Sequence, residues 1–238
     1  MKQSLFFLLL FTSISLAQIQ RVLIVGDSWA QLQIDHNSHN QVFADNGFTD
    51  IIIAPISDSV AADGLEAAYW ATPSQLQTVI DALIANPEID TVQLTIGGND
   101  FLNAWSINMT MMEELALQQQ IADDLATIAD EILALDSKIE IILSFYDYPN
   151  FVDTIGGLFG GICNDLLNDM GIPTTTELNI AATAFEQMYL QIANNNPRIY
   201  HVSHFGLMQS FYGFPSNGIQ PGDIMPPVIY RYPLLLKP

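Results

Sequence analysis

The chain has 238 residues, half of them hydrophobic, and its 26 acidic residues against 6 Lys and Arg give a formal net charge of −20 at pH 7. The apolar content excludes a disordered chain, and the length suits one domain of ordinary size. A surface this acidic repels polyanions, which argues against nucleic acid and anionic membranes as partners.

Residues 1–17 predict a secretory signal peptide. Lys2 precedes an apolar stretch from Leu5 to Phe11, and Ser15-Leu16-Ala17 is a small-x-small cleavage pattern. This stretch is too short to span a membrane, and Asp, Glu or Asn interrupts every later apolar run. We therefore expect a secreted or periplasmic protein without stable membrane insertion, with a single domain over residues 18–238.

Cys163 is the single cysteine of the chain. In an exported protein, an odd cysteine indicates an intermolecular bridge, a free thiol or a partner cysteine that the chain lacks.

Short apolar runs, rich in β-branched residues, predict buried parallel strands. They are Val22–Val25, Asp50–Ile56, Thr91–Ile96, Ile139–Phe145 and Arg198–Val202. Because helical segments lie between these runs, the sequence predicts a three-layer α/β domain with a five-stranded parallel sheet.

Three segments between the strands have the period of amphipathic helices. Their apolar positions are Leu76, Val79, Ile80 and Leu83; Ile121, Leu125, Ile128, Ile132 and Leu135; and Ile180, Ala184, Met188 and Ile192. Two other stretches, Asn150–Thr176 and Gly206–Pro238, are rich in loop-forming residues and predict loops.

Ser28 follows the first predicted strand in the sequence Gly26-Asp27-Ser28, and Trp29 begins a segment that can start a helix. In open α/β sheets, ligands bind beyond the carboxyl ends of the strands. A hydroxyl at that place, beside free backbone N–H groups, is suited to nucleophilic catalysis. The alternative is a strand-ending turn in which Asp27 or Ser28 caps the helix.

A second polar turn, Gly97-Gly98-Asn99-Asp100, follows the third predicted strand. The carboxyl ends of parallel strands meet at one edge of a sheet, so the Asn99 amide is expected in the same crevice as Ser28, as a donor to a developing oxyanion. The alternative is a glycine turn with an Asx cap.

These two blocks resemble those of the GDSL/SGNH hydrolases, secreted serine esterases and lipases on a flavodoxin-like sheet. The resemblance implies that Ser28 is the nucleophile of an acyl-enzyme and that Asn99 is an oxyanion donor, with no cofactor and no metal. Trp29 stands where Leu is commoner. Asp58 stands at the glycine of the family's second block, whose backbone N–H is another donor, and a carboxylate there opposes a forming oxyanion.

The family's last block, D-x-x-H, which supplies the general base and its orienting Asp, is absent from the sequence. His201 and His204 are interpreted as structural, and His204 is the only histidine expected near the crevice. The simplest interpretation is a domain that lacks its C-terminal part and whose activity is impaired, because loss of one triad member costs most of the rate. Asp35 and His36 together with His39 could suggest a metal site, but without a third clear ligand the two histidines are interpreted as polar surface, so no metal site is predicted.

Trp29 and Tyr146 are the predicted substrate-binding residues, with packing into the core as the alternative for the aromatic segment that contains Tyr146. We expect an ester hydrolase that acts on a small-molecule ester, a lipid or an acylated glycan. The alternative function is that of a non-catalytic relative that binds a glycan or a lipid in the same crevice.

Overall fold

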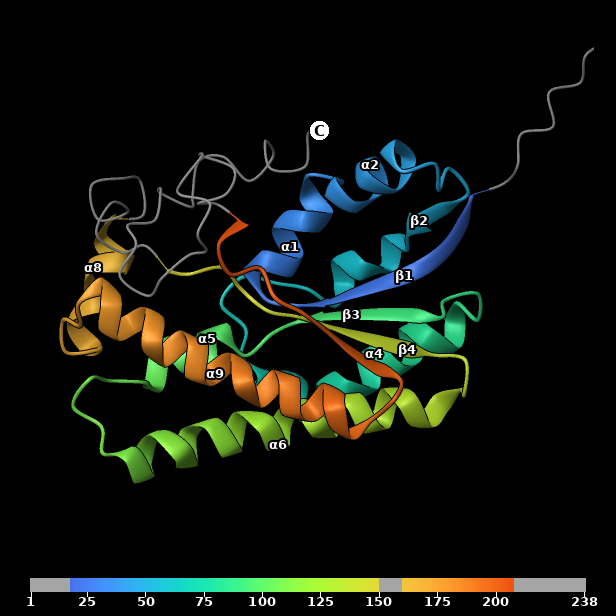
Figure 1. Cartoon of the computed structure of the whole chain (residues 1–238). Helices are drawn as coiled ribbons and strands as arrows, with labels where there is room; N and C mark the ends of the chain where they lie inside the picture. The colour runs from blue at the N-terminus through green and yellow to red at the C-terminus, as the bar shows by residue number, and fades with distance from the viewer. Residues whose placement is uncertain (1–17, 150–159, 208–238) are drawn as a thin grey trace, which may run out of the picture.

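The computed structural model describes residues 18–149 and 160–207, and its centre is a sheet of parallel strands (Figure 1). The strands are β1 (Ile19–Gly26), β2 (Ile51–Ile53), β3 (Thr91–Thr95), β4 (Glu140–Ser144) and β5 (Ile199–Val202). Their order, β2-β1-β3-β4-β5, is that of a doubly wound sheet. The predicted α/β class and five-stranded parallel sheet are confirmed.

Strand β1 is buried because its alternate residues face two apolar layers. Leu23 and Val25 of β1 face the larger core, whereas Val22 and Ile24 face a smaller cluster on the other side. Burial on both faces explains why the sequence of β1 is a continuous apolar run.

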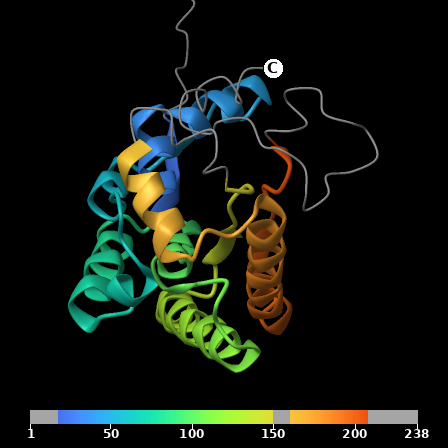
Figure 2. The same ribbon diagram turned by 90° about the vertical axis from the view of Figure 1, so that its left-hand side faces the viewer.

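Helices lie on both sides of the sheet, as the three-layer prediction required. Figure 1 shows α1 (Ser28–Asp35) and α2 (Ser38–Asp45) above it and α4 (Pro73–Ala85), α6 (Met111–Leu135) and α9 (Thr175–Asn195) below it. In Figure 2 the blue helices α1 and α2 again lie on the side opposite α6. The other described helical elements are η1 (Pro55–Ser59), α3 (Ala67–Trp70), α5 (Gly98–Ala104) and α8 (Gly160–Asp169).

The two longest helices begin at capping boxes. Thr110 accepts a hydrogen bond from the backbone of Glu113 while the Glu113 carboxylate binds the Thr110 backbone, and Thr174 and Glu177 repeat the arrangement at α9. Each box satisfies donors that a helix start leaves free, which fixes where α6 and α9 begin.

Two predictions about the helical layer are wrong in part. Helix α8 lies within the predicted loop Asn150–Thr176. In α9, Ile180 is 55% exposed, and the buried face instead includes Leu178, Phe185 and Tyr189. The predicted second strand is also shorter, because Pro55 begins the 3-10 helix η1.

The signal peptide, residues 150–159 of the first predicted loop and residues 208–238 of the second lie outside the described residues. Among the described helices, none has the length and apolarity that crossing a membrane requires.

Candidate active site

The two polar turns leave adjacent strands at the same edge of the sheet. Strands β1 and β3 are parallel neighbours, and Gly26 pairs with Thr95 at their carboxyl ends. Ser28 follows the first of these residues and Asn99 follows the second. The predicted shared edge is confirmed, whereas the chemical roles of the two residues stay predictions.

Gly26 is required for the close approach of the two strand ends. A Cβ at this position would lie 2.0 Å from the carbonyl oxygen of Thr95. The Gly26 N–H donates to the Val60 carbonyl at 3.1 Å, and its carbonyl accepts from Trp70 Nε1 at 3.3 Å. The turn before Ser28 is therefore held in place by contacts with Thr95, Val60 and Trp70.

Ser28 is the first residue of α1 and is half-buried. Asp27 caps the helix, because its Oδ1 accepts a hydrogen bond of 2.9 Å from the Trp29 N–H. The Ser28 side chain makes no hydrogen bond within the described part of the chain. The capping role of Asp27, an alternative in the sequence, thus occurs together with a serine hydroxyl that has no hydrogen-bond partner among the described residues.

The Asp27 carboxyl group is only 1% exposed. Burial raises its pKa from 3.8 to about 7, against the opposing effect of hydrogen bonds from Tyr146 and Trp29. A carboxyl group that titrates near neutral pH thus lies directly before the candidate nucleophile.

Tyr146 lies against both turns. Its hydroxyl donates to Asp27 Oδ2 at 2.5 Å and accepts from the Gly98 N–H at 3.1 Å. Its ring packs edge-on against Trp29, with centroids 5.4 Å apart. The two predicted substrate-binding residues are therefore neighbours at the site, and sequence reasoning missed the polar role of the Tyr146 hydroxyl.

The Asn99 amide already has one partner, because its Nδ2 donates to the Leu65 carbonyl at 2.8 Å. At the other end of the same segment, the Ala62 N–H donates to the Gly26 carbonyl at 3.2 Å. Residues 62–65 therefore run from the Ser28 turn to Asn99. The backbone N–H groups of Asp63 and Gly64 lie between these two anchored points.

Asp58 is exposed in η1, and its carboxylate accepts a hydrogen bond of 3.1 Å from Gln31 of α1. Its place as the counterpart of the family's second-block glycine stays a prediction. The carboxylate is engaged by a side chain on the exposed side of α1, one turn beyond Ser28.

Asp100 has a structural role that sequence reasoning missed. Its carboxylate accepts from the N–H groups of Ala67, at 2.7 Å, and Ala68, at 3.4 Å. Burial raises the Asp100 pKa. Asp100 therefore caps the start of α3. The only sign of this role in the sequence was that an acidic residue directly follows Asn99.

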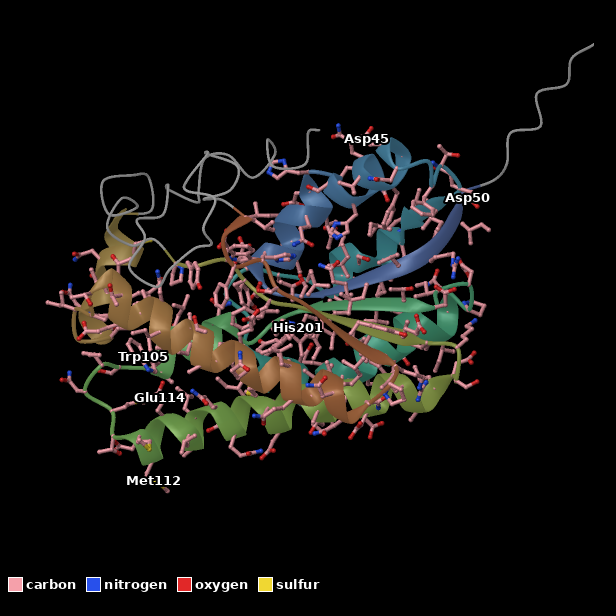
Figure 3. The ribbon with its side chains drawn as sticks, in the orientation of Figure 1. Asp45, Asp50, Trp105, Met112, Glu114 and His201 are labelled. Carbon is pink, nitrogen blue, oxygen red and sulfur yellow. The ribbon has the colours of Figure 1, made fainter. Side chains whose placement is uncertain are left out.

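Three of the four histidines are at least partly buried, in two environments, whereas His36 is exposed at the end of α1. His201 lies between β5 and α9 (Figure 3), with its Nε2 3.5 Å from Glu186 Oε1 and its ring near Phe145. His204 and His39 lie on the opposite side of the sheet, where burial lowers the pKa of both. Neither His201 nor His204 hydrogen-bonds to Ser28. This is consistent with a structural role for both histidines, which stays a prediction.

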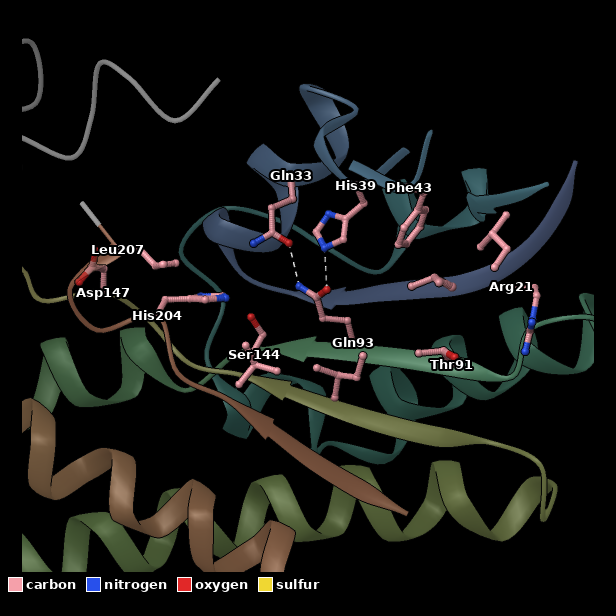
Figure 4. Close-up of a pocket in the computed structure, with 14 residues that line it drawn as sticks. Arg21, Gln33, His39, Phe43, Thr91, Gln93, Ser144, Asp147, His204 and Leu207 are labelled. Carbon is pink, nitrogen blue, oxygen red and sulfur yellow. Dashed lines mark hydrogen bonds between the residues drawn. The ribbon is translucent and has the colours of Figure 1, made fainter. Parts of the chain in front are cut away.

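A pocket of about 650 Å³ lies between α1, α2 and the face of the sheet (Figure 4). Gln93 in its wall bonds to His39 at 2.8 Å and to Gln33 at 2.7 Å. His204 also lines this pocket, whereas Ser28 and Asn99 do not. Within the described ranges, no group of three or more His, Cys, Asp or Glu residues is placed to hold a metal ion.

No family model matches the chain, and no curated protein matches it. Among solved structures, a Streptococcus pneumonia protein described as a platelet activating factor has a TM-score of 0.53 and 16% identity, over 90% of this chain and 79% of that one. A gut microbial diltiazem-metabolizing enzyme has a TM-score of 0.54 and 9% identity, over 87% of this chain and 41% of that one. A lipase from a goat rumen metagenome has a TM-score of 0.47 and 14% identity, over 80% of this chain and 83% of that one. At these identities the similarity is one of fold, that of an α/β domain with a parallel sheet.

Proposed function

We propose that the chain is an exported serine hydrolase of carboxylic esters. The observation that carries the proposal is the pairing of Gly26 with Thr95, because it places the Ser28 turn and the Asn99 turn side by side. The Tyr146 hydroxyl, bonded to both turns, supports the same assignment. The substrate is a small-molecule ester, a lipid or an acylated glycan.

In the proposed reaction, Ser28 Oγ attacks the ester carbonyl carbon and loses its proton to a base. The amide of Asn99 has a second N–H besides the one bonded to Leu65, and this N–H donates to the oxyanion. The C–O bond of the ester then breaks and the alcohol leaves. Water attacks the acyl-Ser28 ester, which releases the acid and restores the serine.

The backbone N–H groups of Asp63 and Gly64 are the proposed second source of oxyanion donors. They lie in the segment anchored at Ala62 to the Ser28 turn and at Leu65 to Asn99. This segment is chosen over Asp58, whose side chain is bonded to Gln31. An oxyanion donor is effective when it is held in place before the reaction, and both ends of this segment are held.

The rate is expected to be low, because no described residue accepts a hydrogen bond from the Ser28 hydroxyl. Without a general base, a serine enzyme keeps only the part of its rate enhancement that the oxyanion donors and substrate binding provide. Trp29, half-buried beside Tyr146, is the proposed contact for the acyl or alcohol group.

The proposal is tested with the hydrolysis of p-nitrophenyl acetate by the wild-type chain, Ser28→Ala and Ser59→Ala. Ser59 is an exposed serine whose hydroxyl donates to the Ile56 carbonyl, so it is a matched control. We expect Ser28→Ala to lose the protein-dependent rate and Ser59→Ala to retain it. An equal rate in wild type and Ser28→Ala contradicts the proposal.

A non-catalytic glycan- or lipid-binding protein is the second candidate, favoured because none of residues 18–149 and 160–207 accepts a hydrogen bond from the Ser28 hydroxyl. It predicts equal background hydrolysis in wild type and Ser28→Ala, together with saturable binding of an acylated oligosaccharide or a fatty acid by calorimetry. Export itself is proposed from residues 1–17 and is tested by N-terminal sequencing of the protein recovered outside the cytoplasm.

A further inference from the structure

The Tyr146 hydroxyl bonds to the two residues that directly precede the proposed catalytic groups. Asp27 comes before Ser28, and Gly98 comes before Asn99. The hydroxyl donates to the Asp27 carboxyl group at 2.5 Å and accepts from the Gly98 N–H at 3.1 Å. One oxygen atom therefore joins the nucleophile turn to the helix that carries the oxyanion donor.

We infer that Tyr146 is a positioning residue that holds Ser28 and Asn99 in register with each other through Asp27 and Gly98. The inference rests on the proposed function, because it assigns Tyr146 a task within that reaction. Tyr146 comes from the segment after β4, so a third element of the sheet fixes the relative position of the two turns.

Both residues that bond to the Tyr146 hydroxyl, Gly98 and Asp27, are suited to a tyrosine at this position. A Cβ on Gly98 would lie 2.7 Å from Cζ of the Tyr146 ring, so only glycine leaves room for the ring to lie against the backbone. Asp27 is 1% exposed, and loss of the hydroxyl would leave its Oδ2 without this donor. An unsatisfied buried acceptor of this kind costs more than the hydrogen bond itself contributes.

The Tyr146 phenol keeps its own proton. Burial and the nearby Asp27 carboxyl group raise the pKa of Tyr146 well above its ordinary value, so the phenol remains neutral over the working pH range. The Asp100 charge also raises the pKa of Asp27, and Asp27 in turn raises that of Tyr189, whose hydroxyl donates to the Ile96 carbonyl. Tyr146 therefore acts as a fixed donor and acceptor, which is a positioning role and not an acid–base one.

The test compares Tyr146→Phe with Tyr200→Phe in the full chain. Tyr200 is an exposed matched control, because its hydroxyl also donates to a carboxylate, that of Glu140, at 3.2 Å. For p-nitrophenyl acetate we expect Tyr146→Phe to lower kcat between about tenfold and about a hundredfold, with KM changed less than about twofold. Tyr200→Phe should leave both constants unchanged.

Amide hydrogen exchange, measured by NMR, provides a readout that does not depend on turnover. The Trp29 N–H donates to Asp27 Oδ1, whereas the Tyr146 hydroxyl donates to the other carboxylate oxygen, Oδ2. If Tyr146 holds Asp27 in place, the exchange of both the Gly98 and the Trp29 amides speeds up in Tyr146→Phe and neither changes in Tyr200→Phe. Unchanged Trp29 exchange overturns the inference, whatever the rate of hydrolysis.

The outcomes separate this inference from the proposed function. Loss of hydrolysis in Ser28→Ala with a Tyr146→Phe rate equal to that of Tyr200→Phe overturns the positioning role and leaves the function standing. If the wild type has no Ser28-dependent hydrolysis, the proposed function fails and the Trp29 exchange alone decides the positioning role. Should Tyr146→Phe fail to fold, Asp27→Ser removes the hydrogen bond to Tyr146 while it retains a capping oxygen, and the same fall in kcat is expected of it.

Discussion

Tyr146 donates a hydrogen bond of 2.5 Å to Asp27, from a position 119 residues further along the chain. This bond connects the segment after β4 to the turn between β1 and α1. It also places a buried carboxyl group directly before Ser28, the candidate nucleophile. The stability and the reactivity of the site are therefore both expected to depend on this pair.

The first prediction concerns pH and Asp27. Its pKa is raised from 3.8 to about 7 on folding, so between these pH values the folded state retains a proton that the unfolded state releases. The free energy of unfolding therefore falls as pH rises from about 4 to about 7, by up to roughly 4 kcal/mol from this group. Asp27→Asn does not titrate and should escape this loss.

The measurement is urea unfolding of wild type, Asp27→Asn and the exposed control Asp58→Asn at pH 4.5 and pH 8. The stability of Asp27→Asn relative to wild type should rise between the two pH values, whereas that of Asp58→Asn should change little. A relative stability of Asp27→Asn that is the same at both pH values would show that Asp27 titrates normally.

The second prediction concerns the glycine before the site. A Cβ on Gly26 would lie 2.0 Å from the Thr95 carbonyl oxygen, so Gly26→Ala must push β1 and β3 apart. We expect a loss of about 3 kcal/mol or more in the free energy of unfolding. Gly64→Ala is the control, because Gly64 has a φ of +73° but open space around it, and it should cost only about 1–2 kcal/mol. Equal losses in the two variants would refute the close approach.

The third prediction concerns His204, which lines the pocket between the sheet and α1. Because its ring is not bonded to Ser28, His204→Ala should change the Ser28-dependent rate of p-nitrophenyl acetate hydrolysis less than about threefold. A loss between about a hundredfold and ten-thousandfold would instead identify His204 as the general base.

The fourth prediction uses an added base. If Ser28 lacks a bonded general base, free imidazole should accept its proton and raise the rate of the wild type more than that of Ser28→Ala. The comparison with Ser28→Ala subtracts the hydrolysis that imidazole performs alone. Equal stimulation of the two proteins would mean that Ser28 does not react.

The strands were predictable from the sequence because their signal is local. Val22–Val25 of β1 is buried on both faces, and the glycine turns expected after β1 and β3 are found at Gly26 and Gly97. The edge shared by Ser28 and Asn99 followed from the parallel arrangement alone.

The rest depends on contacts between distant segments, which no local pattern encodes. Asn99 bonds to Leu65, 34 residues away, and the Tyr146 hydroxyl bonds to Asp27. The face of α9 was misjudged because its sequence offers two apolar stripes, and packing against α6 and β5 buries the one that contains Leu178 and Phe185. Helix α8 was missed because its start, Gly160-Gly161, has the composition of a loop.

The central claim is that Ser28 is the nucleophile, and the most direct measurement is the site of covalent modification by a fluorophosphonate. Such a probe forms a stable phosphonyl ester with an activated serine and releases fluoride. Peptide mass spectrometry of the full chain should find the adduct on Ser28, with none on Ser59 and none in Ser28→Ala. An adduct on another serine would contradict the account. The account would also be contradicted if Ser28 carried no adduct under conditions in which a control serine esterase is labelled completely.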